Sequence, residues 1–171
     1  TDNKLVFWND SINFSKEYDF VLTNPPYLHK NKATKEIKSF YFKGNNSFFE
    51  DLYQVSINSI LNSNEGILIV PLNFLSAENS KRIRDIFFNK FRIVSLNIFK
   101  ERVFKDTTYN VISFYYKRAG KYNEKNIVNV NIFPGNTKTK VLLEKKYNWQ
   151  IGGDFFSIIS STKNLLGVYR L

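Results

Sequence analysis

The sequence of 171 residues contains no cysteine and no methionine, and it has only one histidine, four prolines and seven glycines. Without cysteine the chain forms no disulfide, thiolate metal site or cysteine nucleophile. The scarcity of proline and glycine excludes collagen-like and linker-type chains. No apolar run approaches the roughly 20 residues that a membrane span requires, and the opening TDNKLVFWND has no signal-peptide pattern. We therefore expect no membrane partner.

Aromatic and basic residues are abundant instead. The chain has 17 Phe, 10 Tyr and 2 Trp, and its hydrophobic fraction of 43% suffices for the core of one compact domain. Its 25 Lys and Arg exceed its 15 Asp and Glu, which gives a net charge of +10. This excess suits a polyanionic partner such as nucleic acid, but lysine-rich drift in an AT-rich gene explains it equally well. The absence of methionine favours an internal piece of a longer protein.

Apolar runs of strand length alternate with stretches of helical periodicity in the first 118 residues. The expected strands are residues 4–8, 18–23, 66–71, 93–99 and 110–117. The expected helices are residues 47–61, where Ser47 and Glu50 suggest a capping box, and residues 76–89. Residues 28–46 have no clear period and are expected to form a long loop. Alternating strands and helices with short links predict crossover connections and a mostly parallel α/β sheet.

The sequence becomes polar and rich in turn residues near Gly120, where we place an approximate domain boundary. Residues 1–119 are expected to form one unit and residues 120–171 an extension. Within the extension, residues 127–133 are typical of a strand, Pro134 begins a turn, and residues 140–147 suit a short helix.

The tetrad Asn24-Pro25-Pro26-Tyr27 follows a buried strand directly, at the strand end where open α/β sheets bind ligands. A rigid turn alone explains Pro-Pro but not the flanking Asn and Tyr. The amino group of an aromatic base is a poor nucleophile, and two oxygen acceptors on its hydrogens aim its lone pair outward. Asn24 Oδ1 and the Pro25 carbonyl suit these positions, because two prolines fix the backbone beforehand. Tyr27 offers a flat face on which a flipped base stacks. Neither metal nor thiol is required.

This tetrad resembles the catalytic motif of the S-adenosylmethionine-dependent N6-adenine DNA methyltransferases of restriction–modification systems. The similarity continues, in order and spacing, through the segments FEDLY (49–53), GILIVP (66–71), NFL (73–75) and VFKD (103–106). The resemblance implies a partial Rossmann-like class I methyltransferase domain with a C-terminal extension. It implies methyl transfer to adenine N6 in duplex DNA with base flipping, S-adenosylmethionine as cofactor, and a place in the cytoplasm of a bacterium or archaeon.

The same resemblance assigns roles to individual residues. Asn24 and Pro25 would hold the target amino group, with Pro26 fixing the turn. Tyr27 would stack on the flipped adenine, and Phe104 would pack against the adenine's other side or edge. Asp10 matches an acidic position that contacts the cofactor, although a surface turn explains it nearly as well. We expect Asn24 to contribute to the cofactor site too.

One part of the family pattern has no counterpart in this sequence. The family holds its cofactor through an early strand and a Gly-rich loop, and nothing before Asp10 supplies them. We therefore expect an N-terminal half of the same protein upstream, and a target-recognition region beyond residue 120. Lys30, Lys32, Lys35 and Lys38 suit contact with a DNA backbone, or equally a solvated loop.

Other readings remain open. Similar tetrads occur in methyltransferases that modify a protein glutamine or a ribosomal RNA guanine, because these nitrogens are also planar and weakly nucleophilic. A non-catalytic DNA-binding piece is a third interpretation.

Overall fold

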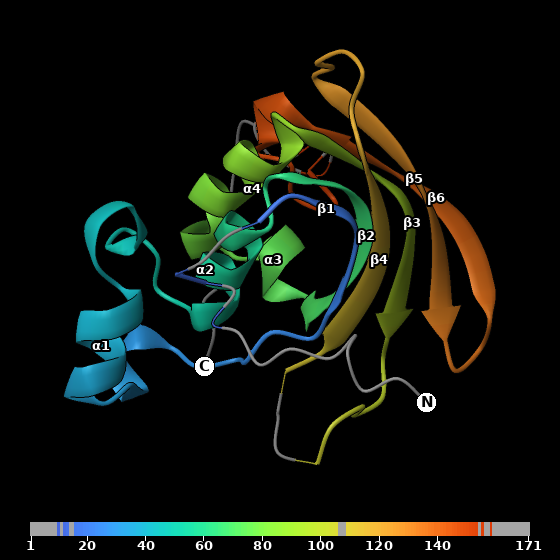
Figure 1. Ribbon diagram of the computed structural model, residues 1–171. Coiled ribbons are helices and arrows are strands. Elements are labelled where there is room, and N and C mark those ends of the chain that lie inside the picture. The colour runs from blue at the N-terminus through green and yellow to red at the C-terminus, as the bar shows by residue number, and fades with distance from the viewer. Residues whose placement is uncertain are drawn as a thin grey trace, which may run out of the picture.

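The computed structural model describes residues 10, 12, 13, 16–105, 109–153, 155 and 158 (Figure 1). The strand expected at residues 4–8 lies outside the described residues. The described strands form one sheet in the order β1-β2-β4-β3-β5-β6. Their bounds are Tyr18–Thr23 (β1), Ser63–Pro71 (β2), Phe91–Phe99 (β3), Val111–Arg118 (β4), Lys125–Phe133 (β5) and Thr137–Glu144 (β6).

The sheet confirms the α/β class and has a mixed pairing pattern. β1 pairs with β2 and β3 with β5 in parallel, whereas β4 is antiparallel to both neighbours and β6 is antiparallel to β5. The strands β1, β2, β3 and β5 therefore run in one direction, and β4 and β6 in the other. The reason lies in the connections. A helical crossover joins β2 to β3. The described residues before β4 and before β6 include no helix, and each of these strands turns back beside its predecessor.

Helices cover one face of the sheet. Figure 1 shows α2, α3 and α4 stacked against it, while α1 projects away from the body. Their bounds are Lys35–Tyr41 (α1), Leu52–Ser59 (α2), Asn73–Ser76 (α3) and Lys81–Phe88 (α4). Single 3₁₀ turns occupy Lys30–Lys32, Gly44–Asn46, Glu78–Ser80 and Lys145–Tyr147.

The helices expected at residues 47–61 and 76–89 were right in position and wrong in detail. The short helix expected at residues 140–147 is wrong, because Thr137–Glu144 pair with β5 as strand β6 and only a 3₁₀ turn follows. The expected loop at 28–46 contains α1, because the Thr34 hydroxyl accepts the backbone N–H of Ile37 and caps a helix there. The capping box expected at Ser47 is absent from the start of α2, which begins five residues later. Instead Gln54 Oε1 accepts the backbone N–H groups of Glu50 and Asp51 (2.9 and 3.3 Å).

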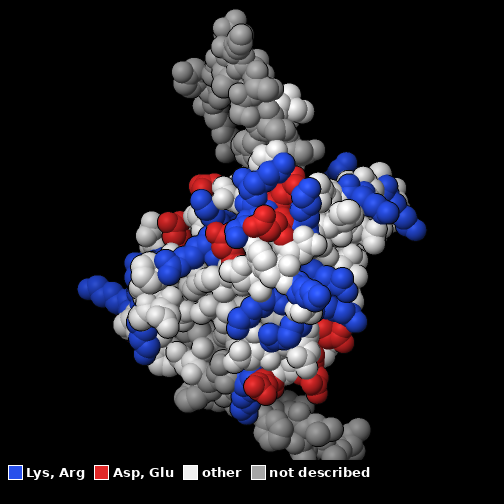
Figure 2. Space-filling model, turned by 90° about the horizontal axis from the view of Figure 1, so that it is seen from above, with Lys and Arg blue, Asp and Glu red and all other residues white. Residues whose placement is uncertain are grey.

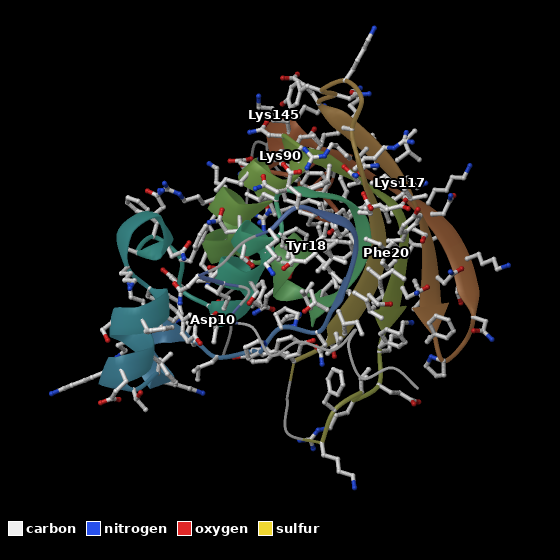
Figure 3. All side chains as sticks on the ribbon, viewed as in Figure 1. Asp10, Tyr18, Phe20, Lys90, Lys117 and Lys145 are labelled. Atoms are coloured by element: carbon white, nitrogen blue, oxygen red, sulfur yellow. The ribbon has the colours of Figure 1, made fainter. Side chains whose placement is uncertain are left out.

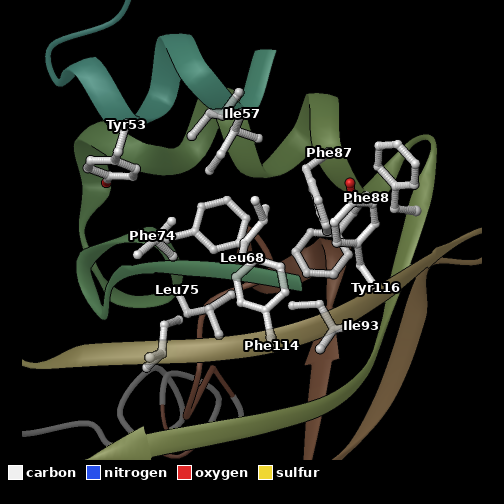
Figure 4. Close-up of a cluster of buried hydrophobic side chains, with 14 of the residues drawn as sticks. Tyr53, Ile57, Leu68, Phe74, Leu75, Phe87, Phe88, Ile93, Phe114 and Tyr116 are labelled. Carbon is white, nitrogen blue, oxygen red and sulfur yellow. The ribbon is translucent and has the colours of Figure 1, made fainter. Parts of the chain in front are cut away.

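Aromatic rings dominate the core between the helices and the sheet (Figure 4). Phe74 of α3 stacks on Phe114 of β4 with ring centroids 5.4 Å apart. Phe87 of α4 meets Phe74, Phe114 and Tyr116 edge-on, at 5.5 to 5.7 Å. Each such ring, fully buried, contributes about 1.5–3 kcal/mol through the apolar area it removes from water. These contacts fix α3 and α4 against the centre of the sheet.

Gly66 permits close packing of β1, β2 and β4. A Cβ atom at this position would lie 2.3 Å from the Val21 carbonyl oxygen and 2.8 Å from the Tyr116 hydroxyl. No other residue fits without moving a strand. The close approach of β1 and β4 to β2 therefore requires glycine at this position.

The segment after Gly120 shares this core. Trp149 stacks on Phe88 of α4 at 4.5 Å, and the Ile151 N–H donates to the Leu75 carbonyl. Arg84 of α4 is fully buried, and its guanidinium donates to the carbonyls of Phe74, Ala77 and Asn148 (3.0, 2.7 and 2.6 Å). Burial lowers the pKa of this guanidinium below its usual value. One side chain thus joins α3, α4 and the C-terminal segment.

We predict that Arg84→Met lowers the free energy of unfolding by about 3 kcal/mol, since one buried and two partly buried carbonyls lose their donor. Urea unfolding of the purified chain measures this value. Lys81→Met, on the exposed side of the same helix, is the matched control and is expected to change it by less than about 0.5 kcal/mol. An unchanged midpoint for Arg84→Met would contradict this account of the core.

Buried phenols make the fold sensitive to alkali. Burial raises the pKa of Tyr53 from 10.0 to about 12, and its hydroxyl lies 2.7 Å from Ser80 Oγ. Because the unfolded chain ionises first, stability is full below pH 10 and falls as the pH rises to about 12. We predict that Tyr53→Phe weakens this dependence, as measured by urea unfolding across that range. A slope as steep as that of the unsubstituted chain would count against the assignment.

Candidate functional site

The tetrad Asn24-Pro25-Pro26-Tyr27 leaves β1 at the edge of the sheet where β1, β2, β3 and β5 all end. Pro25 is buried, whereas Asn24 and Pro26 are exposed and Tyr27 is half-buried. The two prolines restrict their own φ angles, and each also restricts the residue before it. The tetrad is therefore a rigid turn with the Asn24 amide facing outward.

The Tyr27 hydroxyl anchors this turn to the neighbouring strand. It lies 2.8 Å from Asn24 Oδ1 and 3.0 Å from the Ile69 carbonyl oxygen of β2, and it shares its single proton between these acceptors. An amide oxygen has two acceptor positions, so Asn24 Oδ1 keeps one for a further N–H donor. Burial raises the pKa of Tyr27 to about 12, so its phenol stays protonated at neutral pH.

Phe104 reaches the tetrad from a different part of the chain. It lies in the connection between β3 and β4, and its ring centroid is 6.2 Å from that of Tyr27, with the planes at 66°. This is an edge-on aromatic contact. The structure thus brings together the two aromatic residues that the sequence singled out for the target base. Their proposed roles on a base are taken up below.

Arg102 shapes the segment that carries Phe104. We call residues 100–105 the Phe104 loop. Arg102 Nε donates to the Phe104 carbonyl (3.1 Å) and Nη2 donates to the Lys105 carbonyl. The guanidinium therefore folds the loop back on itself and fixes the backbone that presents the ring. Sequence reasoning missed this residue, because an arginine two positions before an aromatic residue has no distinctive pattern.

Asp10 is held by a local turn. Its two carboxylate oxygens accept the backbone N–H of Ile12 (3.1 Å) and the side-chain amide of Asn13 (2.8 Å). Figure 3 labels it on the described chain before β1. Each oxygen retains a further acceptor position, because a carboxylate accepts about four hydrogen bonds. The turn reading of Asp10 and the cofactor reading are thus compatible, and the cofactor role stays a prediction.

The lysines after the tetrad divide into engaged and outward-facing groups. Lys30 donates to the Ser47 carbonyl (2.9 Å) and lies over the Phe42 ring, and Lys43 lies over Phe40. Lys32, Lys35 and Lys38 are in or close to the exposed turn and first half of α1. His29 is also engaged, since its Nδ1 accepts the Asn31 N–H and its Nε2 is 3.9 Å from Glu50.

Basic side chains also gather at the opposite end of the sheet. Figure 2 views that end, where blue side chains stand among red ones. Lys117 pairs with Glu65, Lys125 with Glu144 and Lys145 with Glu124, at 3.0 to 3.6 Å. These pairs are exposed on at least one side and contribute little to stability. Among the described residues, basic side chains are therefore found at both ends of the sheet, and many of those at this end are neutralised by carboxylates.

The described residues include neither a cluster of metal ligands nor a membrane-spanning helix. Among them, no group of three or more His, Cys, Asp or Glu side chains is placed to hold a metal ion. None of the helices in this part of the chain is long and apolar enough to cross a membrane.

Three solved structures that share this fold come from restriction–modification proteins. One is a modification subunit of a putative type I restriction enzyme from Vibrio vulnificus YJ016, at 18% identity and TM-score 0.52, covering 71% of this chain and 27% of that one. A second belongs to a type I restriction–modification complex, at 14% identity and TM-score 0.53, covering 88% and 30%. A third is the type IIG restriction endonuclease BpuSI, at 18% identity and TM-score 0.50, covering 74% and 17%. The chain spans less than a third of each.

The sequence itself assigns the family. The comparison with curated proteins gives no match. The family model described as the Eco57I restriction-modification methylase matches residues 1–104, which include the tetrad and Phe104. This match covers more than half of the chain, so the chain belongs to the Eco57I restriction-modification methylase family.

Proposed function

We propose that this chain is the catalytic and target-base part of an enzyme that transfers a methyl group from S-adenosylmethionine to adenine N6 in duplex DNA. The observation that carries the proposal is the rigid Asn24–Tyr27 turn at the carboxyl edge of the sheet, with Phe104 against Tyr27. Membership of a restriction–modification methylase family supports it. When bound, S-adenosylmethionine supplies an electrophilic methyl group on a sulfonium.

The chain's own residues act on the nitrogen that receives the methyl group. The free acceptor position of Asn24 Oδ1 takes one N–H of the adenine amino group, and the Pro25 carbonyl takes the other. Both acceptors sit on a turn that proline holds in place, so little reorganisation accompanies the reaction. The nitrogen lone pair then points toward the methyl group instead of lying in the ring system.

Tyr27 and Phe104 form the binding place for a flipped base. An adenine taken out of the duplex must replace its lost stacking, and an aromatic side chain offers about 1–3 kcal/mol per base. The Tyr27 ring supplies the face on which the base stacks, and the Phe104 ring, in edge-on contact with Tyr27, bounds the site on another side. The Tyr27 phenol is protonated at neutral pH, so it can keep donating to Asn24 and Ile69 while its ring face stacks on the base.

The cofactor site needs more than this chain contributes. Asp10 offers a half-buried carboxylate of a type that suits a nucleoside, but no strand followed by a Gly-rich loop precedes it in the sequence. β1 also ends the described sheet, and its Phe20 and Leu22 side chains, at 49% and 69% exposure, lie on the sheet face opposite the buried Val21. We infer that an upstream half of the protein pairs with this edge strand, covers that face and completes the cofactor site.

This proposal also assigns the parts of the chain. Residues 1–119 form the catalytic half, and residues 120–171 lead toward a target-recognition region. Duplex DNA, S-adenosylmethionine and the upstream half are the proposed partners. Lys32 and Lys35 are exposed beside the tetrad and Lys38 is half-exposed, and in this proposal they would contact DNA phosphates.

We predict that Asn24→Ala in the full-length protein lowers the rate of methyl transfer to DNA by about 100-fold or more, with DNA affinity nearly unchanged. Transfer of radiolabelled methyl groups from S-adenosylmethionine to duplex DNA measures the rate, and digestion to nucleosides identifies N6-methyladenine. Asn64→Ala, at the amino end of β2, is the matched control and should retain full activity.

Assays with different substrates distinguish DNA methylation from the other proposed activities. Methylation of ribosomal RNA or of a protein glutamine, with none of DNA, would replace the DNA proposal by another amino methyltransferase activity. Full DNA methylation by Asn24→Ala would instead remove the tetrad from catalysis and favour a non-catalytic DNA-binding role.

We predict that the 171-residue chain alone binds S-adenosylmethionine weakly or not at all. Isothermal calorimetry of the isolated chain, with the full-length protein measured in parallel, tests this. A dissociation constant equal to that of the full-length protein would show that no upstream half is required.

A further inference from the structure

A cavity of about 420 Å³ opens between the Phe104 loop and the turn that joins β5 to β6. Phe99, Arg102 and Val103 line it from one side, and Phe133 and Asn136 line it from the other. Val103 is the residue directly before Phe104, so the same loop forms a wall of this cavity and of the proposed base site. Its volume is in the range of small-ligand pockets.

The aromatic wall of the cavity is held by the sheet. Phe99 and Phe133 are paired in the register of β3 and β5, and their rings stack at 5.5 Å with the planes at 19°. The Lys100 N–H donates to the Phe133 carbonyl (3.0 Å) just beyond the ladder. Both rings are half-exposed. They present a preorganised apolar face at the same edge of the sheet as the tetrad.

Arg102 couples this wall to the base site. Its bonds to the carbonyls of Phe104 and Lys105 fix the loop that separates the two. The loop also carries Lys100 and Lys105 against the single acidic residue Glu101, so it is net positive. On the other side Asn136 adopts a positive φ of 48° in the turn, with its polar side chain at the cavity.

We propose that this cavity receives the nucleotide that neighbours the target adenine in the same strand; this rests on the proposed function. When adenine leaves the duplex, its neighbour loses a stacking partner, and that loss is part of the cost of flipping. The Phe99–Phe133 pair gives the neighbouring base a replacement face. Stacking on an aromatic ring accepts any base, and the positive loop suits the phosphate between the two nucleotides.

Photocrosslinking in the full-length protein tests this. Duplexes that contain its methylation site carry 5-iododeoxyuridine at the target position, at the adjacent position on either side, or several base pairs away. Irradiation joins this base to an aromatic ring stacked on it, and mass spectrometry identifies the peptide. We expect the target probe to crosslink to Tyr27 or Phe104, and one adjacent probe to crosslink to Phe99 or Phe133.

A substitution at Phe133 distinguishes base stacking from a purely structural role of this residue. Phe133→Leu keeps the apolar bulk but removes the flat ring, so the adjacent crosslink should fall at least about tenfold while the target crosslink persists. Ile127→Leu, at the other end of β5 and 67% exposed, is the matched control and should change neither.

Each other outcome overturns the inference. A target crosslink at Tyr27 or Phe104, with no adjacent crosslink at the cavity in the unsubstituted protein, would reject the cavity and leave the proposed function standing. Absence of both crosslinks would reject the proposed function and the cavity with it. An equal loss of both in Phe133→Leu would reduce Phe133 to a structural role.

Discussion

The antiparallel strand β4 between β2 and β3 is the constraint on which the site depends. Because β4 reverses between them, β2 and β3 run in the same direction, and their carboxyl ends reach one edge of the sheet. The turn after β1 and the loop after β3 therefore meet, although the strands that carry them are separated by two others. The contact between Tyr27 and Phe104 follows from that pairing.

At this edge of the sheet the tetrad backbone is rigid, yet the Asn24 side chain is accessible to a ligand. Two prolines and the Tyr27 hydroxyl bond to β2 immobilise the tetrad, while Asn24 remains exposed with an acceptor position free. In the Phe104 loop the Arg102 side chain restrains the backbone through hydrogen bonds, whereas in the tetrad the proline rings restrain it. Neither arrangement requires an ionisable catalytic group, which agrees with chemistry on a nitrogen that reacts with an already electrophilic carbon.

The sequence predicted the strands better than the helices, for a physical reason. β1 is a short apolar run that ends at Pro-Pro, so its bounds matched residue for residue. α1 was missed because it is short: it begins at a single Thr34 cap, and its three apolar residues, Ile37, Phe40 and Tyr41, stand within a lysine-rich stretch. The start of α2 shifted because Gln54 caps the backbone at Glu50 and Asp51, and α4 starts late because the 3₁₀ turn Glu78–Ser80 precedes it. The stacking of Trp149 on Phe88 was likewise invisible in the sequence.

The sequence by itself determined that the chain has no thiol and that the tetrad follows a buried strand, because these depend on residue types at fixed local spacing. From the tetrad it also predicted two oxygen acceptors and a stacking tyrosine. It also named Phe104 through a family resemblance. Only the tertiary structure decided that Phe104 lies against Tyr27, that Arg102 holds its loop, and that Phe99 and Phe133 form a wall beside it. The two aromatic contacts depend on strand order and register, and no local pattern encodes which strand lies next to which. The Arg102 bonds are local, but they depend on a loop conformation that the residue types do not specify.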